Sequence, residues 1–520
     1  MKNLLALIIS FFIYTSLAAQ KHDYVWMFGY YNSDFSIDTL RGGVNLDFNY
    51  TPAQHYRHLR LAGFNECNTS FCDSVGNLIF YSNGTGIYDR RDSLMSRGDS
   101  LNYGNYWEHS FNDSNDYLEG LRIVQSMLSL PMPGNNAKAI IIHFPVNFMV
   151  PNNIIPSYLA DTLFCTEIDL TANFGFGDVL SKQVKINLDT LSYSNMSAVR
   201  HGNGRDWWII RPYYHGNAYY KFLLTDTGIG LYNIQHEGAN HENYGDFGSS
   251  CFSPNGEKYF WVTASDGIRM FDFDRCTGTL IDGGIIPFPD SLFGWDAGLV
   301  AGIAVSPNNR FLYVTSPKIV LQYDLFAANI GASVDTVAVW DGVYDPVSPL
   351  AATFFLAQLG PDGKIYLNST NGTISLHVIN RPDESGDSCL FIQRGVKLNT
   401  YNANSLPNFP NYRLGALVGS GCDTLSTLTE SLRAEKEKLL KVYPNPAKDV
   451  VTVDYGFTDW NKGDVNLEIS NTLGQVVYSQ SIPRYSGFQR LDVSGFPVGA
   501  YQAAIIRTGA VVSLAKFVKE

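Results

Sequence analysis

The chain has 520 residues, of which 37 are Lys or Arg and 49 are Asp or Glu, so its formal net charge is −12. This balance argues against a nucleic-acid-binding protein, because such proteins neutralise phosphates with basic patches. Hydrophobic residues make up 45% of the chain and can fill a large core, which excludes a disordered protein. Aromatic residues at 14%, with 46 Gly and 22 Pro, exclude a coiled coil and favour short β-strands joined by many turns.

The first 19 residues predict a secretory signal peptide. Lys2 supplies a positive charge, residues 4–17 form an apolar run, and Ala18 and Ala19 are small residues suited to cleavage before Gln20 or close by. A membrane anchor is the alternative, but the run is shorter than the ~20 residues of a membrane span. We therefore expect a mature protein that is exported and has no membrane span after signal removal.

Export makes disulfide bonds possible, yet the sequence does not assign their pairing. The number of cysteines is odd, so at least one is unpaired, and their density is too low for a disulfide scaffold. We expect Cys67 and Cys251, which stand in strand-like segments, to be buried thiols. The seven cysteines are Cys67, Cys72, Cys165, Cys251, Cys276, Cys389 and Cys422.

Residues 20–422 are organised by an internal repeat. Segments 251–274, 304–325 and 358–379 share a strand, a Pro-Asn or Pro-Asp turn, a second strand, another turn and a third strand. Three weaker copies precede them, within residues 68–224. Strands with no intervening helical pattern argue against a parallel α/β fold, and sheets repeated in this way predict a β-propeller.

Two pieces at opposite ends of the repeat array predict a seventh blade. Residues 24–28 and 43–48 read as strands with no first strand before them, and residues 404–412 read as a first strand with no hairpin after it. We predict that they pair in one sheet and so close a seven-bladed ring through N- and C-terminal strands. Closure of this kind removes an exposed sheet edge.

Three further segments, residues 66–84, 198–208 and 406–410, resemble a propeller family of secreted Gram-negative bacterial proteins. They read Glu-Cys-Asn-Thr-Ser-Phe-Cys-Asp-Ser-Val-Gly-Asn-Leu-Ile-Phe-Tyr-Ser-Asn-Gly, Ala-Val-Arg-His-Gly-Asn-Gly-Arg-Asp-Trp-Trp and Leu-Pro-Asn-Phe-Pro. The similarity spans most of residues 22–418. It implies the architecture and no particular reaction.

The composition changes after the propeller. Residues 423–440 are charged in their middle and poor in aromatic residues, which predicts a linker, either a short helix or a solvated tether. Residues 441–520 then hold six or seven strand-like runs of the kind that form a small β-sandwich.

This last segment contains five short motifs in order: Tyr443-Pro-Asn-Pro, Leu473-Gly-Gln-Val-Val, Leu491-Asp-Val-Ser, Pro497-Val-Gly-Ala-Tyr and Lys516-Phe-Val-Lys. With these motifs it resembles the type A C-terminal sorting domain of the type IX secretion system, which implies a route through the periplasm. The resemblance implies that the secretion machinery is a partner, that the protein is secreted or displayed on the outer cell surface, and that the domain is removed afterwards. Phe496 departs from the family pattern, since the family usually has Leu before the proline that corresponds to Pro497. The residues that we assign to the sorting signal are Tyr443, Pro444, Asn445, Pro446, Gly474, Gly499, Tyr501 and Lys516.

Few residue patterns point to chemistry. His236 and His241 are five residues apart, whereas a helical zinc motif needs four, so we expect a loop there, and a surface turn at residues 55–58. Residues 112–119 are rich in oxygen ligands but lack the spacing of a calcium-binding EF-hand loop. We expect no metal site and no cofactor.

Propeller ligands usually sit at one mouth of the central channel, near the starts of the innermost strands. The acidic candidates there are Glu66, Asp246 and Asp296. We expect them to cap turns or bind backbone amides and assign no catalytic residue; the alternative is that paired carboxylates there perform general acid–base catalysis on a sugar.

Nine Asp-Ser or Asp-Thr pairs precede Leu or Val. Turn chemistry explains them, and the pattern is also similar to the O-glycosylation acceptor of bacteria that use this secretion route. The aspartates are Asp38, Asp73, Asp92, Asp99, Asp161, Asp189, Asp290, Asp335 and Asp423.

Taken together, the sequence predicts a non-catalytic binding or interaction protein with an extracellular glycan or protein ligand. The alternative is a secreted hydrolase or lyase that degrades polysaccharide or peptide. An enzyme needs two or three convergent carboxylates or a His pair around one ligand atom, whereas a binding protein needs mainly aromatic and amide side chains.

Overall fold

The computed structural model describes residues 20–30, 40–58, 60, 62–110, 116–149, 157–241, 248–263, 267–289, 302–345, 349–402, 404–423, 440–455, 465–472, 475–482, 487–507 and 510–520. Antiparallel sheets dominate these residues. The helical elements among them are short: α1 (Asn105–Ser110), α2 (Ala172–Gly175) and 3-10 turns at Asp116–Glu119, Gly331–Ser333 and Gly386–Cys389.

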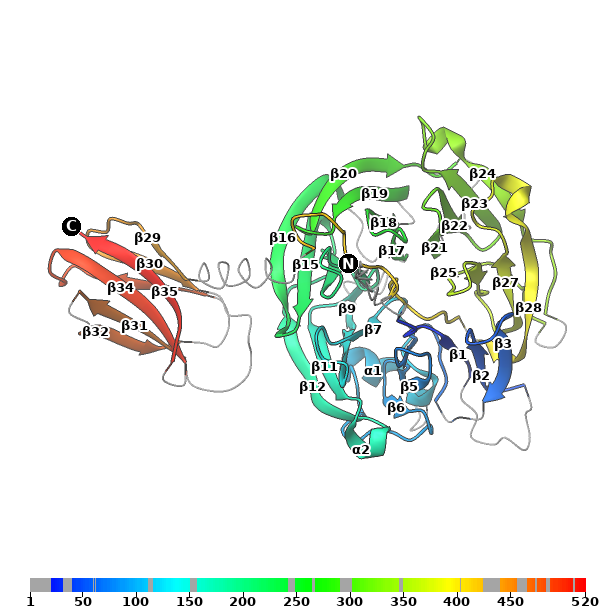
Figure 1. The fold of residues 1–520 in the computed structure, drawn as a ribbon, viewed down its shortest axis with the longest axis horizontal. Coiled ribbons are helices and arrows are strands. Elements are labelled where there is room, and N and C mark those ends of the chain that lie inside the picture. The colour runs from blue at the N-terminus through cyan, green and yellow to red at the C-terminus, as the bar shows by residue number, and fades with distance from the viewer. Residues whose placement is uncertain are drawn as a thin grey trace, which may run out of the picture.

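The part of the chain that the structure describes between residues 25 and 402 forms seven sheets of three or four strands, arranged in chain order around a ring (Figure 1). The first sheet contains β1 (Val25–Tyr30), β2 (Gly42–Asp47) and β3 (Gln54–His58), and the second β4 (Thr69–Cys72), β5 (Leu78–Ser82) and β6 (Ile87–Asp89). The third sheet contains β7 (Met127–Pro131), β8 (Lys138–His143), β11 (Leu163–Asp169) and β12 (Asp178–Asn187), and a separate hairpin pairs β9 (Asn147–Met149) with β10 (Ser157–Leu159).

The remaining four sheets of the ring have four strands each, paired in sequence order. The fourth sheet contains β13 (Ser197–Arg200), β14 (Trp207–Pro212), β15 (Gly216–Thr225) and β16 (Gly228–His241), and the fifth β17 (Ser250–Phe252), β18 (Lys258–Thr263), β19 (Gly267–Asp274) and β20 (Thr279–Ile286). The sixth contains β21 (Gly302–Val305), β22 (Phe311–Thr315), β23 (Ile319–Asp324) and β24 (Asp335–Val339), and the seventh β25 (Ala357–Leu359), β26 (Ile365–Leu367), β27 (Thr373–Ile379) and β28 (Phe391–Asn402). These are the sheets from which the predicted blades are built, and they confirm the all-β, propeller-like fold.

The predicted proline turn joins the first strand to the second in the fifth, sixth and seventh sheets. In each turn the residue before the proline donates its backbone N–H to a carbonyl across the turn, with N···O distances of 2.9 Å at Ser253, 2.8 Å at Ser306 and 2.7 Å at Gly360. The proline restricts the backbone to a conformation that suits a turn, and the residue before it donates the hydrogen bond that joins the two strands.

The core of the ring lies between adjacent sheets. Along β18, Tyr259 and Trp261 pack against the fourth sheet, whereas Phe260 and Val262 pack against the sixth. All four side chains are buried. Successive residues of a strand point to opposite faces, so a run of large apolar residues fills two layers of the core at once.

The predicted closing strand is wrong. Residues 404–412 form no strand, and among the described residues no strand pairs with β1 on its inner side. Pro407 and Pro410 lack backbone N–H groups, so this segment cannot donate regular ladder bonds. The two ends of the ring meet instead where β28 packs against β1, β2 and β3, and the N–H of Tyr401 donates to the carbonyl of Leu40 at 2.8 Å.

Residues 404–423, here called the channel segment, pass through the middle of the ring (Figure 1). Near its beginning, the Asn408 amide group donates to the carbonyls of Met127 and Met196, at the starts of innermost strands. Further along, Asn411 donates to the carbonyl of Pro254, just beyond the end of β17, at 2.8 Å. The channel segment therefore runs from the side where the innermost strands start to the side where they end.

Residues 440–520 form a separate two-sheet unit. One sheet has the order β29 (Leu440–Tyr443), β30 (Val450–Tyr455) and β33 (Gly487–Asp492), and the other has the order β32 (Val476–Ser481), β31 (Val465–Asn471), β34 (Gly499–Arg507) and β35 (Ala510–Lys519). A buried cluster that includes Val453, Leu467 and Phe517 joins them, which confirms the β-rich C-terminal domain. The predicted linker falls almost wholly on residues 424–439, outside the described residues.

Candidate functional site

Of the three predicted acidic residues, the structure describes Glu66. It precedes β4, and its backbone N–H donates to the carbonyl of Leu121 at 3.3 Å. Burial raises the pKa of its carboxyl from 4.5 to about 7, while a hydrogen bond from the Asn404 side chain and the charge of Arg122 oppose that rise. Asp246 and Asp296 lie outside the described residues, and their place at the channel mouth stays a prediction.

A cavity of about 260 Å³ lies in the channel. One wall is the channel segment from Asn408 to Arg413, and the opposite walls are the first strands of the fourth to seventh sheets with the proline turns that follow three of them. Gln125, Ser250 and Gln358 add amide and hydroxyl groups to the lining. The cavity is therefore completed by a segment that comes from the far end of the propeller sequence.

Two amide side chains of the cavity wall form hydrogen bonds to neighbouring backbone groups. The Gln125 amide group donates to the carbonyl of Ser250 at 2.9 Å, and its oxygen accepts the N–H of Ser250 at 2.8 Å. Asn408 donates to the carbonyls of Met127 and Met196 at 3.1 and 2.9 Å. The Asn408 side chain thus holds the channel segment against the innermost strands, and the Gln125 amide group also donates to Oδ1 of Asn408 at 3.4 Å.

Asp23 and Arg413 form the charged corner of the cavity. The Arg413 guanidinium donates to both carboxylate oxygens of Asp23, at 2.6 and 2.9 Å. The Asp23 side chain is 3% exposed. Burial raises the pKa of this carboxyl and Arg413 opposes the rise, so the pair ties the residues before β1 to the channel segment.

The interpretation of residues 404–412 as a strand gives no reason to expect these residues at a site. A signal was present: Asn404, Asn408 and Asn411 stand around two prolines. An asparagine side chain can make the backbone-directed hydrogen bonds that a proline-containing segment cannot. Such a pattern indicates an extended segment held through its side chains.

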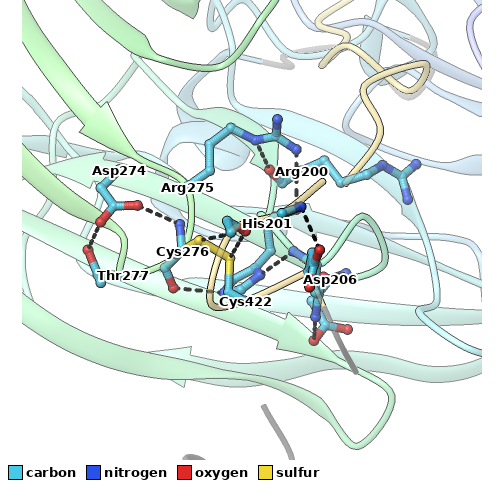
Figure 2. The surroundings of a disulfide bond; sticks show 12 residues. Arg200, His201, Asp206, Asp274, Arg275, Cys276, Thr277 and Cys422 are labelled. Atoms are coloured by element: carbon cyan, nitrogen blue, oxygen red, sulfur yellow. Dashed lines mark hydrogen bonds between the residues drawn. A yellow bond between two sulfur atoms is a disulfide. The ribbon is translucent and has the colours of Figure 1, made fainter. Parts of the chain in front are cut away.

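The channel segment ends at a disulfide between Cys276 and Cys422 (Figure 2). Cys276 lies in the turn between β19 and β20, and its carbonyl is 3.0 Å from Nε2 of His201. The nearby Arg275 donates to the carbonyl of Arg200 at 2.8 Å. Turns of the fourth and fifth sheets therefore meet the end of the channel segment here. Of the two expected buried thiols, Cys67 is a buried free thiol and Cys251 a half-buried one.

The two histidine motifs are strand residues, which corrects the predicted loop and turn. His236 and His241 belong to β16, where His241 is buried edge-on against Trp261. Residues 55–58 belong to β3. β3 and β16 are the outermost strands of their sheets, and most of their side chains are exposed or half-buried. Among the described residues, no three His, Cys, Asp or Glu side chains gather as metal ligands would, and residues 112–115 lie outside them.

The sorting-signal residues explain how the C-terminal domain closes. Asn445 donates from its amide group to the carbonyl of Lys516 at 3.1 Å, and its oxygen accepts the N–H of Val518 at 2.9 Å. This side chain thus pairs with β35 as a neighbouring strand would. Tyr501 is buried, stacks on Phe517 with ring centroids 5.5 Å apart, and donates to the carbonyl of Pro497 at 2.8 Å.

The other sorting-signal positions lie at edges. Tyr443, Pro444 and Pro446 are exposed at and just after β29, an edge strand, as the loss of donors at proline requires. Gly499 begins β34, and Gly474 lies outside the described residues.

Of the Asp-Ser and Asp-Thr pairs that the structure describes in full, most lie outside strands, and Asp335 with Thr336 begins β24. Four of their hydroxyl residues are exposed: Ser74, Ser93, Ser100 and Thr336. Asp73 shows the turn chemistry, since its Oδ1 accepts the N–H groups of Val75 and Asn77 at 3.0 and 2.9 Å. Exposure makes these sites accessible to a modifying enzyme, and O-glycosylation stays a prediction.

Comparison with known proteins identifies the C-terminal domain. Residues 441–520 match the secretion system C-terminal sorting domain. No curated protein sequence matches the chain.

Solved structures give distant likenesses. A candidate 6-phosphogluconolactonase from Bacteroides uniformis is 11% identical, with a TM-score of 0.37, over 72% of this chain and 97% of that chain. A gluconolactonase from Xanthomonas campestris is 12% identical, with a TM-score of 0.29, over 66% and 91% of the two chains. The Cps50 (Swd1) β-propeller domain from Myceliophteria thermophila is 9% identical, with a TM-score of 0.31, over 63% and 87%. At these values none of them bears on the activity of this chain.

The sorting domain shows that the protein is exported by the type IX secretion system to the cell surface or the extracellular space. The secretion machinery is accordingly a partner. Among the described residues, no helix is long and apolar enough to cross a membrane. The exported protein contains a propeller-like domain, and the channel segment of the same chain passes through the middle of its ring.

Proposed function

We propose that the propeller is an extracellular binding or interaction domain whose ligand, a glycan or a protein segment, enters the channel cavity. The chemistry of the cavity wall carries this proposal. Amides, hydroxyls, prolines and Phe409 line it, and its carboxylate, Asp23, is held by two hydrogen bonds from Arg413. Neutral hydrogen-bonding groups beside apolar ones favour the binding of a neutral ligand over the transfer of protons.

The domain division belongs to the same proposal. A signal peptide at residues 1–19 is removed, and residues 20–422 form the propeller that binds the ligand. Residues 423–440 link the propeller to residues 441–520, which direct export. In support of it, the apolar clusters of the ring and of the sorting domain share no residue.

The test is binding by the mature chain, residues 20–520, on a glycan array and on an array of extracellular proteins, together with a general hydrolase screen. We expect saturable binding to a limited class of glycans or proteins and no turnover. Turnover of a polysaccharide or peptide would contradict the proposal and favour the enzyme.

One observation favours a secreted hydrolase as the second candidate. A carboxyl with a pKa of about 7, such as that of Glu66, has the protonation behaviour of a general acid. If the hydrolase screen finds an activity, Glu66→Gln should abolish it, whereas Glu384→Gln at an exposed position should not. Retained activity in Glu66→Gln would remove Glu66 from the reaction.

A further inference from the structure

The channel segment is fixed to the ring by a covalent bond at its far end. The Cys276–Cys422 disulfide joins positions 146 residues apart and fastens residue 422 to the turn between β19 and β20. The other five cysteines of the chain are free thiols. The bond therefore joins the channel segment to one particular turn of the fifth sheet.

The surroundings of the disulfide are shaped to hold it. Gly202 lies against both sulfur atoms, and a Cβ added there would stand 2.4 Å from Sγ of Cys422 and 2.9 Å from Sγ of Cys276. The N–H of Gly202 donates to the carbonyl of Arg275 at 2.9 Å, and its carbonyl accepts the N–H of Leu417 at 2.8 Å. A residue without a side chain is therefore needed where the fourth sheet, the fifth sheet and the channel segment meet.

Arg275 reinforces the same junction. Its guanidinium donates to the carbonyl of Arg200 in the fourth sheet and to the carbonyl of Gly415 in the channel segment. The side chain is 3% exposed. The end of the channel segment is thus held by hydrogen bonds from two sheets and by one covalent bond.

The disulfide also lies between the cavity wall and the sorting domain in the sequence. Cys422 comes after the whole of the cavity wall, and the predicted linker to the sorting domain follows at once. A pull on the sorting domain reaches Cys422 before it reaches residues 404–421. With the bond intact, the load passes through Cys276 into the fifth sheet. With the bond broken, the load falls on hydrogen bonds such as those of Asn408 and Asn411.

We infer that the Cys276–Cys422 disulfide is an anchor that keeps the channel segment seated, and the cavity wall complete, when the sorting domain is pulled. Without it, the same pull draws residues 404–422 out of the channel. The inference depends on the position of the bond in the chain, and it holds whatever ligand the cavity takes.

The test pulls on single molecules of the mature chain with optical tweezers. One handle is attached through a short tag inserted at Phe174, a residue of α2 whose side chain is 97% exposed, and the other at the C-terminus. Extraction of the 19 residues 404–422 lengthens the tether by up to about 67 Å at about 3.5 Å per residue. We expect this step in Cys422→Ser, and its absence in the oxidised wild-type protein.

Two further samples keep the test decisive. Folded wild-type protein treated with dithiothreitol should also show the step; the reductant supplies two electrons and two protons to the disulfide and becomes a cyclic disulfide itself. Cys165→Ser, which removes a free thiol, should behave as the wild type. Hydrogen exchange at the amide of Leu417 should rise at least tenfold in Cys422→Ser and after reduction. The step in oxidised wild-type protein, or its absence from both reduced samples, would overturn the inference.

Discussion

Replacing Glu66 with Gln should make the stability of the propeller less dependent on pH. Burial raises the pKa of the Glu66 carboxyl from 4.5 to about 7, so the folded protein favours the protonated form. The stabilisation that this gives is complete below pH 4.5 and is lost as the pH rises through 7. At roughly 1.4 kcal/mol per pH unit, the wild-type protein loses about 3 kcal/mol over this interval through Glu66. The glutamine side chain in the variant keeps an oxygen that can accept the Asn404 hydrogen bond and carries no charge.

The assay is urea unfolding of the full chain at pH 4 and at pH 8, followed by tryptophan fluorescence, because seven of the eight Trp residues precede residue 424. The free energy of unfolding of Glu66→Gln minus that of the wild type should be about 3 kcal/mol more positive at pH 8 than at pH 4. Glu384→Gln, at an exposed position, should show no such change. If the free energy of unfolding of Glu66→Gln differed from that of the wild type by the same amount at pH 4 and at pH 8, the assigned effect of burial on the Glu66 carboxyl would be refuted.

Three other outcomes are expected. Asn445→Ala removes two hydrogen bonds to β35, should cost the sorting domain about 2 kcal/mol, and should reduce export measured as the ratio of extracellular to periplasmic protein; unchanged export would contradict its role. Limited proteolysis of the full chain should cut first within residues 423–440 and release a stable propeller, and early cuts inside the sheets of the ring would refute the boundary. Gly202→Ala should prevent formation of the disulfide and raise the number of reactive thiols in the denatured protein from five to seven. Gly421→Ala, which has open space around the added Cβ, should leave five. Five thiols in both variants would refute the close packing of Gly202 against the disulfide.

The ring could be predicted from the sequence because its signals are local. A Pro-Asn or Pro-Asp turn between two runs of alternating large apolar residues determines a hairpin without reference to the rest of the chain. The C-terminal domain could be predicted for a different reason, since its short motifs resemble a known family. Asn445 then shows the physical meaning of one motif, as a side chain that pairs with the last strand.

The channel segment could not be predicted, because its contacts are almost all distant in sequence. Asn408 bonds to carbonyls 281 and 212 residues away, and Cys422 to a cysteine 146 residues away. The predicted strand is wrong because a strand-like sequence pattern does not distinguish pairing with a sheet from a path through the channel. The Asn404 side chain that hydrogen-bonds to the Glu66 carboxyl and opposes the rise of its pKa likewise comes from more than 300 residues later in the sequence.

Binding of the ligand in the channel cavity can be examined with a single pair of substitutions. The mature wild-type chain and its Gln358→Trp variant, in which an indole fills part of the cavity, are applied to the same glycan and protein arrays. Lys397→Trp, at an exposed position on β28 of the same sheet, is the matched control. The account predicts that Gln358→Trp weakens binding to every ligand of the wild type at least tenfold while Lys397→Trp binds as the wild type does. Unchanged binding by Gln358→Trp would contradict it.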